Sequence, residues 1–253
     1  MIKRNVIYFN NNGGLLVFAA KSVWRRGSSL LAEVSETSNP KRTPPYGRFL
    51  APLIRPFPNF DIIFVQSLRR EAVQLLRLKP GDRVIDAGCG PGGSFEYLLD
   101  AVGPSGTVVG VEISPELARL AERRIAKNHW SNVYVAESAA EAVRLEGSFD
   151  GLLMLGAPDV YGSPQSLSNL LPYLNDGARV VAFGAKLKRS TGGSLLNPLL
   201  RSAFSKLTFA STPALNHNPW VLLQESANDL QIREKFFGWM FLAFGSINKS
   251  VNR

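Results

Sequence analysis

The chain of 253 residues contains little cysteine and little histidine: Cys89 is its one cysteine, and His129 and His217 are its two histidines. A single cysteine excludes an internal disulfide, and these three side chains are too few for a structural zinc site with four Cys and His ligands. We therefore expect no metal centre. The same composition favours a reducing compartment, and we expect the protein to be cytoplasmic.

The sequence also lacks a long hydrophobic run. Its most apolar stretches, residues 15–20 and 236–245, are far shorter than the roughly 18 residues that cross a bilayer, so no membrane span is expected. A secretory signal is not expected either, because Lys21 interrupts the first of these stretches. The basic, serine-containing start is compatible with an organelle transit peptide and equally with plain disorder.

Acidic residues are absent before Glu33. Residues 1–48 carry eight basic and two acidic side chains, so this segment holds +6 of the net charge of +9 and leaves +3 for residues 49–253. A basic protein surface is typical of nucleic-acid binding. Because the excess charge lies in the N-terminal segment, the main part of the chain gives little support to a nucleic-acid partner.

The rest of the chain alternates between strand-like and helix-like segments, which predicts a parallel sheet covered by helices. We expect an α/β, Rossmann-like, doubly wound sheet of seven mostly parallel strands with an antiparallel closing strand and helices on both faces. The expected helices cover residues 59–78, 94–101, 114–128, 139–144 and 164–174. The expected strands cover residues 83–87, 107–113, 132–135, 149–155 and 178–184, a turn follows at 175–177, and a closing pair covers 230–237 and 239–244.

These segments suggest three parts of the chain. The first is a basic flexible arm or leader, the second holds N-terminal cap helices, and the third is the main domain. Their expected bounds are 1–48, 49–80 and 81–253, with an insertion at about 185–219. Such a long insertion near the strand ends is more often functional than not.

The stretch "VIDAGCGPGG", residues 84–93, places Gly88, Gly90 and Gly93 at the G-x-G-x-x-G spacing after an apolar run. Several nucleotide-like cofactors use such a loop, so a nicotinamide dinucleotide must be considered. Asp86 argues against it, because a carboxylate repels a pyrophosphate and attracts an ammonium or sulfonium group. Glu112 ends the second strand, where an acid can accept hydrogen bonds from ribose hydroxyls. An ammonium, a carboxylate and a ribose are all present in S-adenosylmethionine.

The run "LKPGDRVIDAGCGPGGSFEYLLDAVGPSGTVVGVEISPELARLAERR" resembles the class I S-adenosylmethionine-dependent methyltransferases, and the resemblance covers residues 80 to about 184. It implies that S-adenosyl-L-methionine is the cofactor. It also implies a set of cofactor-binding positions on the loops that follow the first, second and fourth strands. These are Asp86, Gly88, Cys89, Gly90, Gly93, Glu112, Ile113 and Gly156, with Asp86, Gly88 and Gly90 near the methionine part, Glu112 on the ribose and Ile113 against adenine.

The third strand departs from the family pattern. The usual "GDA" corresponds to residues 137–139, so Ser138 stands where the family has an acid near the adenine amine, and Ala139 follows it. A hydroxyl can still accept that hydrogen bond.

The family's fourth motif corresponds to residues 149–161, whose end should face the transferred methyl group. It contains no Asp/Asn-Pro-Pro-aromatic tetrapeptide, so methylation of nucleobase nitrogens loses support. Asp159 and Tyr161 are the candidate general bases, although an Asp before a helix is also an ordinary capping residue. His217 in the insertion is a third catalytic candidate. Cys89 and His129 fit structural roles better than chemical ones.

The insertion is basic and apolar. Between residues 185 and 210 it contains five Lys or Arg, no acid and several Leu and Phe. A solvated helix face explains such a pattern. The alternative is a lid that favours an anionic, partly apolar substrate or that contacts a membrane surface holding one.

Together these observations predict a methyltransferase that acts on an oxygen, nitrogen or carbon of a small molecule. An RNA or protein methyltransferase is an alternative that the basic arm would explain. A non-catalytic S-adenosylmethionine-binding or scaffold protein is another, because no essential base is visible. An NAD-dependent oxidoreductase is a third alternative, with less support from the sequence than the other two.

Overall fold

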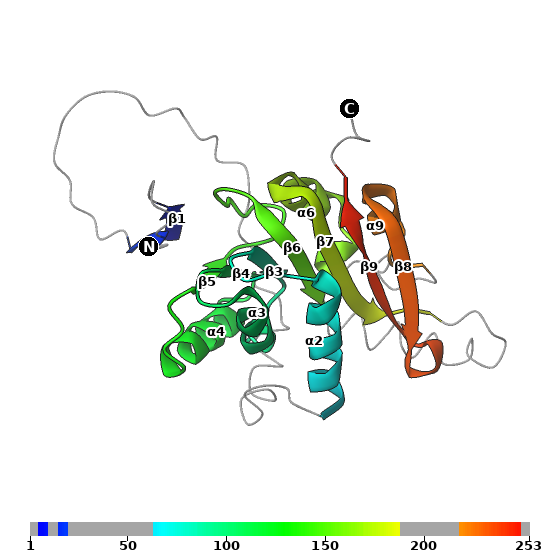
Figure 1. Ribbon diagram of the computed structural model, residues 1–253, viewed down its shortest axis with the longest axis horizontal. Helices are drawn as coiled ribbons and strands as arrows, with labels where there is room; N and C mark the ends of the chain where they lie inside the picture. The colour runs from blue at the N-terminus through cyan, green and yellow to red at the C-terminus, as the bar shows by residue number, and fades with distance from the viewer. Residues whose placement is uncertain (1–4, 10–14, 20–62, 188–217, 249–253) are drawn as a thin grey trace.

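The computed structural model describes residues 5–9, 15–19, 63–187 and 218–248. The main body is a seven-stranded sheet in the order β5-β4-β3-β6-β7-β9-β8. Helices cover both of its faces (Figure 1). The expected α/β class is confirmed, as is the expected mixture of parallel strands with an antiparallel closing strand.

Five neighbouring strands, from β5 to β7, run parallel. The central ones form because short runs of Val, Ile and Leu are buried on both faces of the sheet, as interior parallel strands require. The bounds of the five strands are β3 (Arg83–Ala87), β4 (Thr107–Glu112), β5 (Val133–Glu137), β6 (Phe149–Leu155) and β7 (Leu174–Ala185). Their carboxyl ends share one edge of the sheet, called here the carboxyl edge, where ligands bind in folds of this kind.

Two further strands close the sheet: β9 (Met240–Ile247) is antiparallel to β7, and β8 (Ala227–Lys235) is antiparallel to β9. Met240 pairs with Ala185 on one side and with Lys235 on the other. Because Ala185 ends a parallel strand, the turn between β8 and β9 also lies at the carboxyl edge.

The helices divide between the two faces, and each face has its own hydrophobic core. One face carries α2 (Ile63–Leu76), α3 (Phe95–Val102) and α4 (Pro115–Lys127). The other carries α5 (Pro158–Tyr161), α6 (Pro164–Leu170) and α9 (Val221–Ser226). Short 3-10 turns follow α6 (Leu171–Tyr173) and β8 (Phe236–Gly238).

The helix expected over residues 139–144 is wrong. One turn closes there, with the Val143 N–H donating to the Ala139 carbonyl at 2.9 Å. The Asn169 side chain then donates to the carbonyls of Ala140 and Val143, at 2.8 and 2.9 Å. The hydrogen-bonding capacity of those two carbonyls is thus satisfied by Asn169, a residue outside the segment. The segment therefore needs no further helical turn and continues as an irregular loop.

The turn expected before the fifth parallel strand is instead a bulge within β7. The register shifts from a Phe149–Leu174 pair to a Gly151–Arg179 pair, so β7 holds extra residues at this point. Gly177 there has a φ of 76°, which a glycine adopts without strain. The turn-forming sequence was recognised correctly, but strand pairing continues on both sides of it.

The N-terminal segment contains a hairpin that the sequence did not predict, formed by β1 (Asn5–Phe9) and antiparallel β2 (Leu15–Ala19). The rest of the basic arm, the cap region before α2 and residues 188–217 of the insertion lie outside the described residues. Among the described helices, none has the length and apolar character needed to traverse a bilayer.

Candidate active site

Two carboxylates from neighbouring parallel strands are buried at the carboxyl edge: Asp86 near the end of β3 and Glu112 at the end of β4. The Asp86 side chain is 1% exposed. Its Oδ2 atom has no hydrogen-bond partner among the described residues. A buried, unsatisfied carboxylate oxygen is costly in an isolated fold, so a missing partner is the first explanation to consider.

Burial raises the pKa of Asp86 to about 7. The nearby Arg69 guanidinium opposes this effect and lowers the pKa, whereas the negative charge of Glu112 raises it. The carboxyl group therefore changes its charge close to neutral pH. A cation placed beside it would favour the ionised form.

Glu112 holds the glycine loop in place. Its Oε2 accepts a hydrogen bond from the Gly90 N–H at 2.9 Å, and its Oε1 accepts one from the Ser114 N–H at 2.8 Å. Burial raises the pKa of Glu112 to about 7 although both hydrogen bonds lower it, and the charge of Asp159 raises it further. A carboxylate oxygen has lone pairs for more than one donor, so Glu112 can still accept from hydroxyl groups.

The glycine loop passes close to the loop after β6. A Cβ added at Gly88 would lie 2.5 Å from the Cβ of Ala157, and the φ of Gly88 is 74°, so only glycine fits there. Gly90, at φ 56°, has no atom of the described residues within 4 Å of its Cβ position. Its backbone therefore borders open space on the side where a ligand would lie.

Cys89 and Gly93 lie against other parts of the protein and do not border open space. A Cβ at Gly110 would meet the Cys89 sulfur at 2.7 Å and the ring of Phe95 at 2.8 Å, so the cysteine packs beneath β4. Burial raises the pKa of the Cys89 thiol, which keeps it protonated. A Cβ at Gly93 would overlap the guanidinium of Arg69.

Arg69 is a site residue that the sequence reading missed. It lies on α2 and covers the start of α3 at Gly93, near Asp86. The signal was present in the sequence, because Arg69 shares the helical spacing of the buried Ala72 and Leu76. A cation on the sheet-facing side of a helix indicates a buried or site-facing charge.

The other expected cofactor positions lie on adjacent loops of the same edge. Ser138 follows β5, where its N–H donates to the Glu112 carbonyl at 3.0 Å and its hydroxyl donates to the Ala139 carbonyl at 3.1 Å. Ile113 follows Glu112 directly and is half-buried. Gly156 follows β6, is exposed, and has a φ of 67° with no atom within 4 Å of its Cβ position.

The two candidate bases have different surroundings. Burial raises the pKa of Asp159, and Glu141 raises it further, while the charge of Asp159 also reaches Glu112. Tyr161 is fully buried: its ring packs edge-on against Phe241 at 5.5 Å, and a Cβ at Gly184 would overlap its hydroxyl. Burial raises the pKa of this phenol, so it is a poor base at neutral pH.

The histidines lie apart from this cluster or beyond the described chain. His129 is exposed after α4, with a φ of 55° and its N–H bonded to the Ala126 carbonyl at 3.3 Å, which is a helix-terminating role. His217 lies outside the described residues. Within those residues, no group of three or more His, Cys, Asp and Glu side chains could hold a metal ion.

The chain is similar to known methyltransferases. Residues 62–182 match the family model of protein-L-isoaspartate(D-aspartate) O-methyltransferase. The fold is similar to that of a SAM-dependent methyltransferase from Aquifex aeolicus, with a TM-score of 0.53, 18% identity, and coverage of 71% of this chain and 89% of that one. This part of the chain is therefore similar to the class I S-adenosylmethionine-dependent methyltransferases, in its family-model match and in its fold.

Curated relatives of this methyltransferase domain differ in substrate. The demethylmenaquinone methyltransferase of Symbiobacterium thermophilum is 32% identical over 125 residues, which is 47% of this chain and 49% of the relative. The ribosomal RNA small subunit methyltransferase H of Alteromonas mediterranea is 30% identical over 121 residues, 45% of this chain and 37% of the relative. The match thus spans less than half of the length of each of these relatives.

S-adenosylmethionine fits the residues at the carboxyl edge. The unpartnered Oδ2 of Asp86 suits an ammonium group, and the carboxylate of Glu112, on the neighbouring strand, has the acceptor oxygens that ribose hydroxyls require. Among the described residues, no atom lies within 4 Å of the Cβ positions of Gly90 and Gly156, so the glycine loop and the loop after β6 both leave space for a ligand. A pyrophosphate would instead place negative charge beside two buried acids, so the dinucleotide reading is not supported.

Proposed function

We propose that this protein transfers a methyl group from S-adenosylmethionine to a small-molecule acceptor. The observation that carries the proposal is the buried Oδ2 of Asp86, which has no partner among the described residues although its carboxyl group has a pKa of about 7. A cationic ligand would satisfy this oxygen and stabilise the ionised carboxylate together.

The chain's own residues would bind and orient the cofactor. Asp86 would accept hydrogen bonds from its ammonium group, and Glu112 would accept from the ribose hydroxyls while keeping the Gly90 N–H in place. Arg69, the cation next to the loop, would neutralise the cofactor's carboxylate. Ile113 and Ser138 would border the adenine.

When bound, the cofactor supplies an electrophilic methyl group on a sulfonium. The protein accelerates such an in-line displacement mainly by aligning the acceptor and excluding water. Gly156 opens the fourth-strand loop toward the reaction space, and Asp159 is the remaining described candidate for receiving the acceptor's proton, because its pKa is raised. We assign no chemical step to Tyr161, whose contacts are those of a core residue.

The charge of the described domain favours a small acceptor over RNA. Residues 63–187 and 218–248 carry 14 basic and 17 acidic side chains, a net charge of −3. These described residues lack the excess of basic side chains that is typical of RNA-binding surfaces. The quinone-precursor relative is consistent with a small acceptor, although the ribosomal RNA relative keeps RNA as the second candidate.

An unbiased acceptor search tests the proposal. The full chain is incubated with cell extract and methyl-labelled S-adenosylmethionine, and small molecules, RNA and protein are fractionated before mass spectrometry. We expect label in the small-molecule fraction. Label confined to RNA would contradict the proposed acceptor class, and no transferred label in any fraction would favour a cofactor-binding protein without catalysis.

A matched pair of variants serves as the control. Glu112→Gln should abolish most of the labelling, whereas Glu137→Gln should preserve it. Glu137 pairs with Glu112 in the register of β5 and β4 and ends its strand at the same edge, but it is exposed. Equal loss in both variants would indicate a general charge effect and not a ribose contact.

A further inference from the structure

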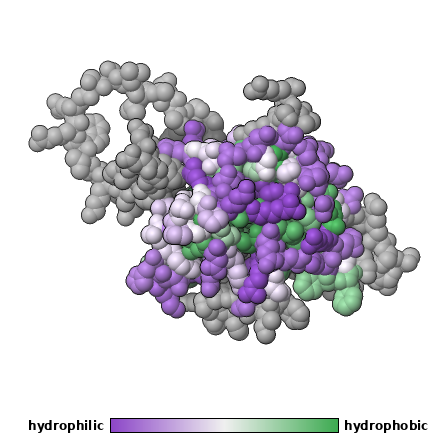
Figure 2. All heavy atoms as spheres, in the orientation of Figure 1, coloured by the Kyte–Doolittle hydropathy of each residue, from purple (hydrophilic) through white to green (hydrophobic). Residues whose placement is uncertain are grey.

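An exposed aromatic tip lies at the carboxyl edge, away from the cofactor residues. Phe237 is 93% exposed and Phe236 is 45% exposed, in the turn between β8 and β9. Figure 2 shows the pale green projection at the lower right of the molecule, where Figure 1 places this turn. Large side chains so far out of the core are uncommon in a protein whose apolar residues are otherwise well buried.

The backbone of the tip holds these rings outward. Phe236 and Phe237 have φ values of 50° and 57°, and Gly238 follows at 83°. Left-handed conformations are rare for bulky residues, and such sites of backbone strain cluster at functional positions. The two exposed rings are therefore carried on a left-handed turn.

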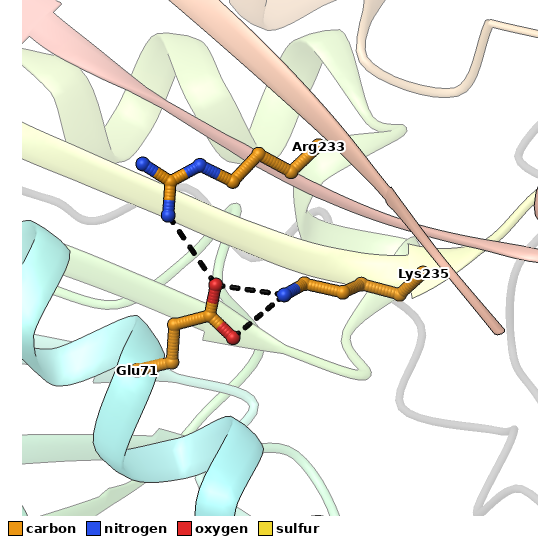
Figure 3. Close-up of polar contacts among 3 residues, drawn as sticks. All are labelled: Glu71, Arg233 and Lys235. Carbon is orange, nitrogen blue, oxygen red and sulfur yellow. Dashed lines mark hydrogen bonds and ion pairs between the residues drawn. The ribbon is translucent and has the colours of Figure 1, made fainter.

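The base of the tip is anchored to the domain. Lys235, the residue before Phe236, donates to both carboxylate oxygens of Glu71 on α2 at 2.8 Å, and Arg233 contacts the same carboxylate at 3.4 Å (Figure 3). On the other strand, the Lys186 N–H donates to the Trp239 carbonyl at 2.9 Å. The tip thus projects from a rigid support at the rim of the active-site edge.

The basic insertion begins and ends beside this tip. The chain leaves the described structure after Leu187, next to Lys186, and the ammonium group of Lys186 lies 5.6 Å from the centre of the Trp220 ring, just after the insertion returns. Residues 186–217 contain five basic side chains and no acid. The chain that joins Leu187 to Asn218 is therefore basic in sequence, whereas the described residues are net negative.

We propose that the Phe236–Phe237 tip inserts into an anionic lipid surface. Apolar aromatic side chains flanked by cations bind the interfacial region of bilayers, and anionic lipids attract basic segments. A protein interface is less suitable, because two projecting side chains offer far less area than the roughly 800 Å² per partner of a stable interface. The neighbouring face of β8 is charged, with Arg233 and Glu234 exposed.

If the proposed function holds, the position of the tip also affects how an acceptor reaches the site. Since the tip and the glycine loop share the carboxyl edge, docking on a bilayer would turn the acceptor side of the site toward the lipid. An apolar acceptor dissolved in the membrane could then reach the site without crossing water.

Vesicle co-sedimentation tests the tip without using the cofactor. The full chain is mixed with sucrose-loaded vesicles of phosphatidylcholine alone or with 30% phosphatidylglycerol. We expect binding to the anionic vesicles, reduced by 0.5 M NaCl, and a partition coefficient about tenfold lower for the double variant F236S/F237S because two apolar side chains are lost. Val221→Ser is the matched control, because Val221 is also an exposed apolar residue, 45% exposed, on α9. It should bind like the wild type.

Three outcomes would overturn the proposal: no binding of the wild type to either vesicle, equal binding of the double variant, or equal losses in the double variant and Val221→Ser. Self-association that depends on the two Phe, seen by sedimentation velocity without lipid, would make a second copy the occupant instead. Thermal melting of each variant checks folding. A parallel titration with S-adenosylhomocysteine separates the two proposals, since failure there would count against the proposed function and leave the vesicle result unaffected.

Discussion

The two halves of the carboxyl edge differ in what fixes their structure. At β3 and β4, adjacent segments of the chain build the site: a strand, a glycine turn and a helix place Asp86 and Gly90 within one short stretch, and Glu112 follows on the next strand. At β7, β9 and β8, the edge is assembled from strands separated by the insertion. In our proposals, the first half binds the cofactor and the second half sets the side from which an acceptor arrives.

Charge distinguishes the halves as well. The cofactor half keeps two acids buried with pKa values near 7, and their desolvation is a cost to the unliganded fold. In the other half, Lys186, Arg233 and Lys235 are each paired with Glu71 or Glu234 near the surface. The cost of burying charge is thus concentrated where the cofactor would bind, so changes there should trade stability against affinity.

The largest expected effect comes from Asp86→Asn. In the unliganded native state, the pKa of Asp86 lies at about 7 against an ordinary value of 3.8, so ionising it costs on the order of 4 kcal/mol. Because the folded pKa is raised, this group's contribution to stability falls as pH rises from about 4 through 7. The variant should therefore raise the free energy of unfolding at pH 8 by about 2 to 4 kcal/mol and weaken cofactor binding at least tenfold, as denaturant unfolding and calorimetry would show. A lower free energy of unfolding for Asp86→Asn would contradict the claim that the ionised Asp86 carboxylate destabilises the unliganded protein.

The next largest effect is on cofactor affinity, and it distinguishes two acids on neighbouring strands. Glu112→Ala should weaken cofactor binding by about 1 to 3 kcal/mol through lost hydrogen bonds, and Glu137→Ala should change it by less than about 0.5 kcal/mol. Titration calorimetry with S-adenosylhomocysteine measures both. Unchanged affinity in Glu112→Ala would remove the ribose contact from the account.

The pH dependence of binding sharpens the same comparison. If an ammonium group pairs with Asp86, binding favours the ionised carboxylate, so affinity should rise about tenfold per pH unit from pH 5 to 7 and level off above the pKa of about 7. Protons should be released below pH 7, which calorimetry in buffers of different ionisation enthalpy detects. The Asp86→Asn variant should lack this dependence, and a dependence that persists in it would have to come from Glu112.

The smallest effect concerns the ion pairs that join the halves. Glu71→Gln weakens the contacts to Lys235 and Arg233 that tie α2 to β8, all of which are partly exposed (Figure 3). We expect the free energy of unfolding to fall by about 0.5 to 1 kcal/mol and cofactor affinity to stay unchanged. A large loss of affinity would show that the two halves are coupled through α2.

The sequence predicted the cofactor half well because its signals are local. The strand bounds of β3 and β6 agree with the expected residues, and the Ser114 hydroxyl caps α4 by accepting from the Leu117 N–H at 3.4 Å. Periodicity, glycine spacing and capping residues are properties of short windows. They could not reveal that Asn169 would satisfy the carbonyls of the 139–144 segment, because that contact depends on a distant residue.

The site was less predictable wherever a tertiary contact decides a side chain's role. Tyr161 looked like a base because it follows the fourth strand, but its position under Phe241 makes it a core residue. The helical spacing placed Arg69 on the buried side of α2, but its contact with Gly93 depends on how α2 packs in the fold. The exposure of Phe237 was equally hidden, since an apolar strand end normally indicates burial.

A crystal structure with S-adenosylhomocysteine is the most direct test of the central claim. The account predicts the ligand's amino group within hydrogen-bond distance of Asp86 Oδ2 and both ribose hydroxyls on the carboxylate of Glu112. A nucleoside bound elsewhere, or an Asp86 that still has no partner beside a bound ligand, would contradict it.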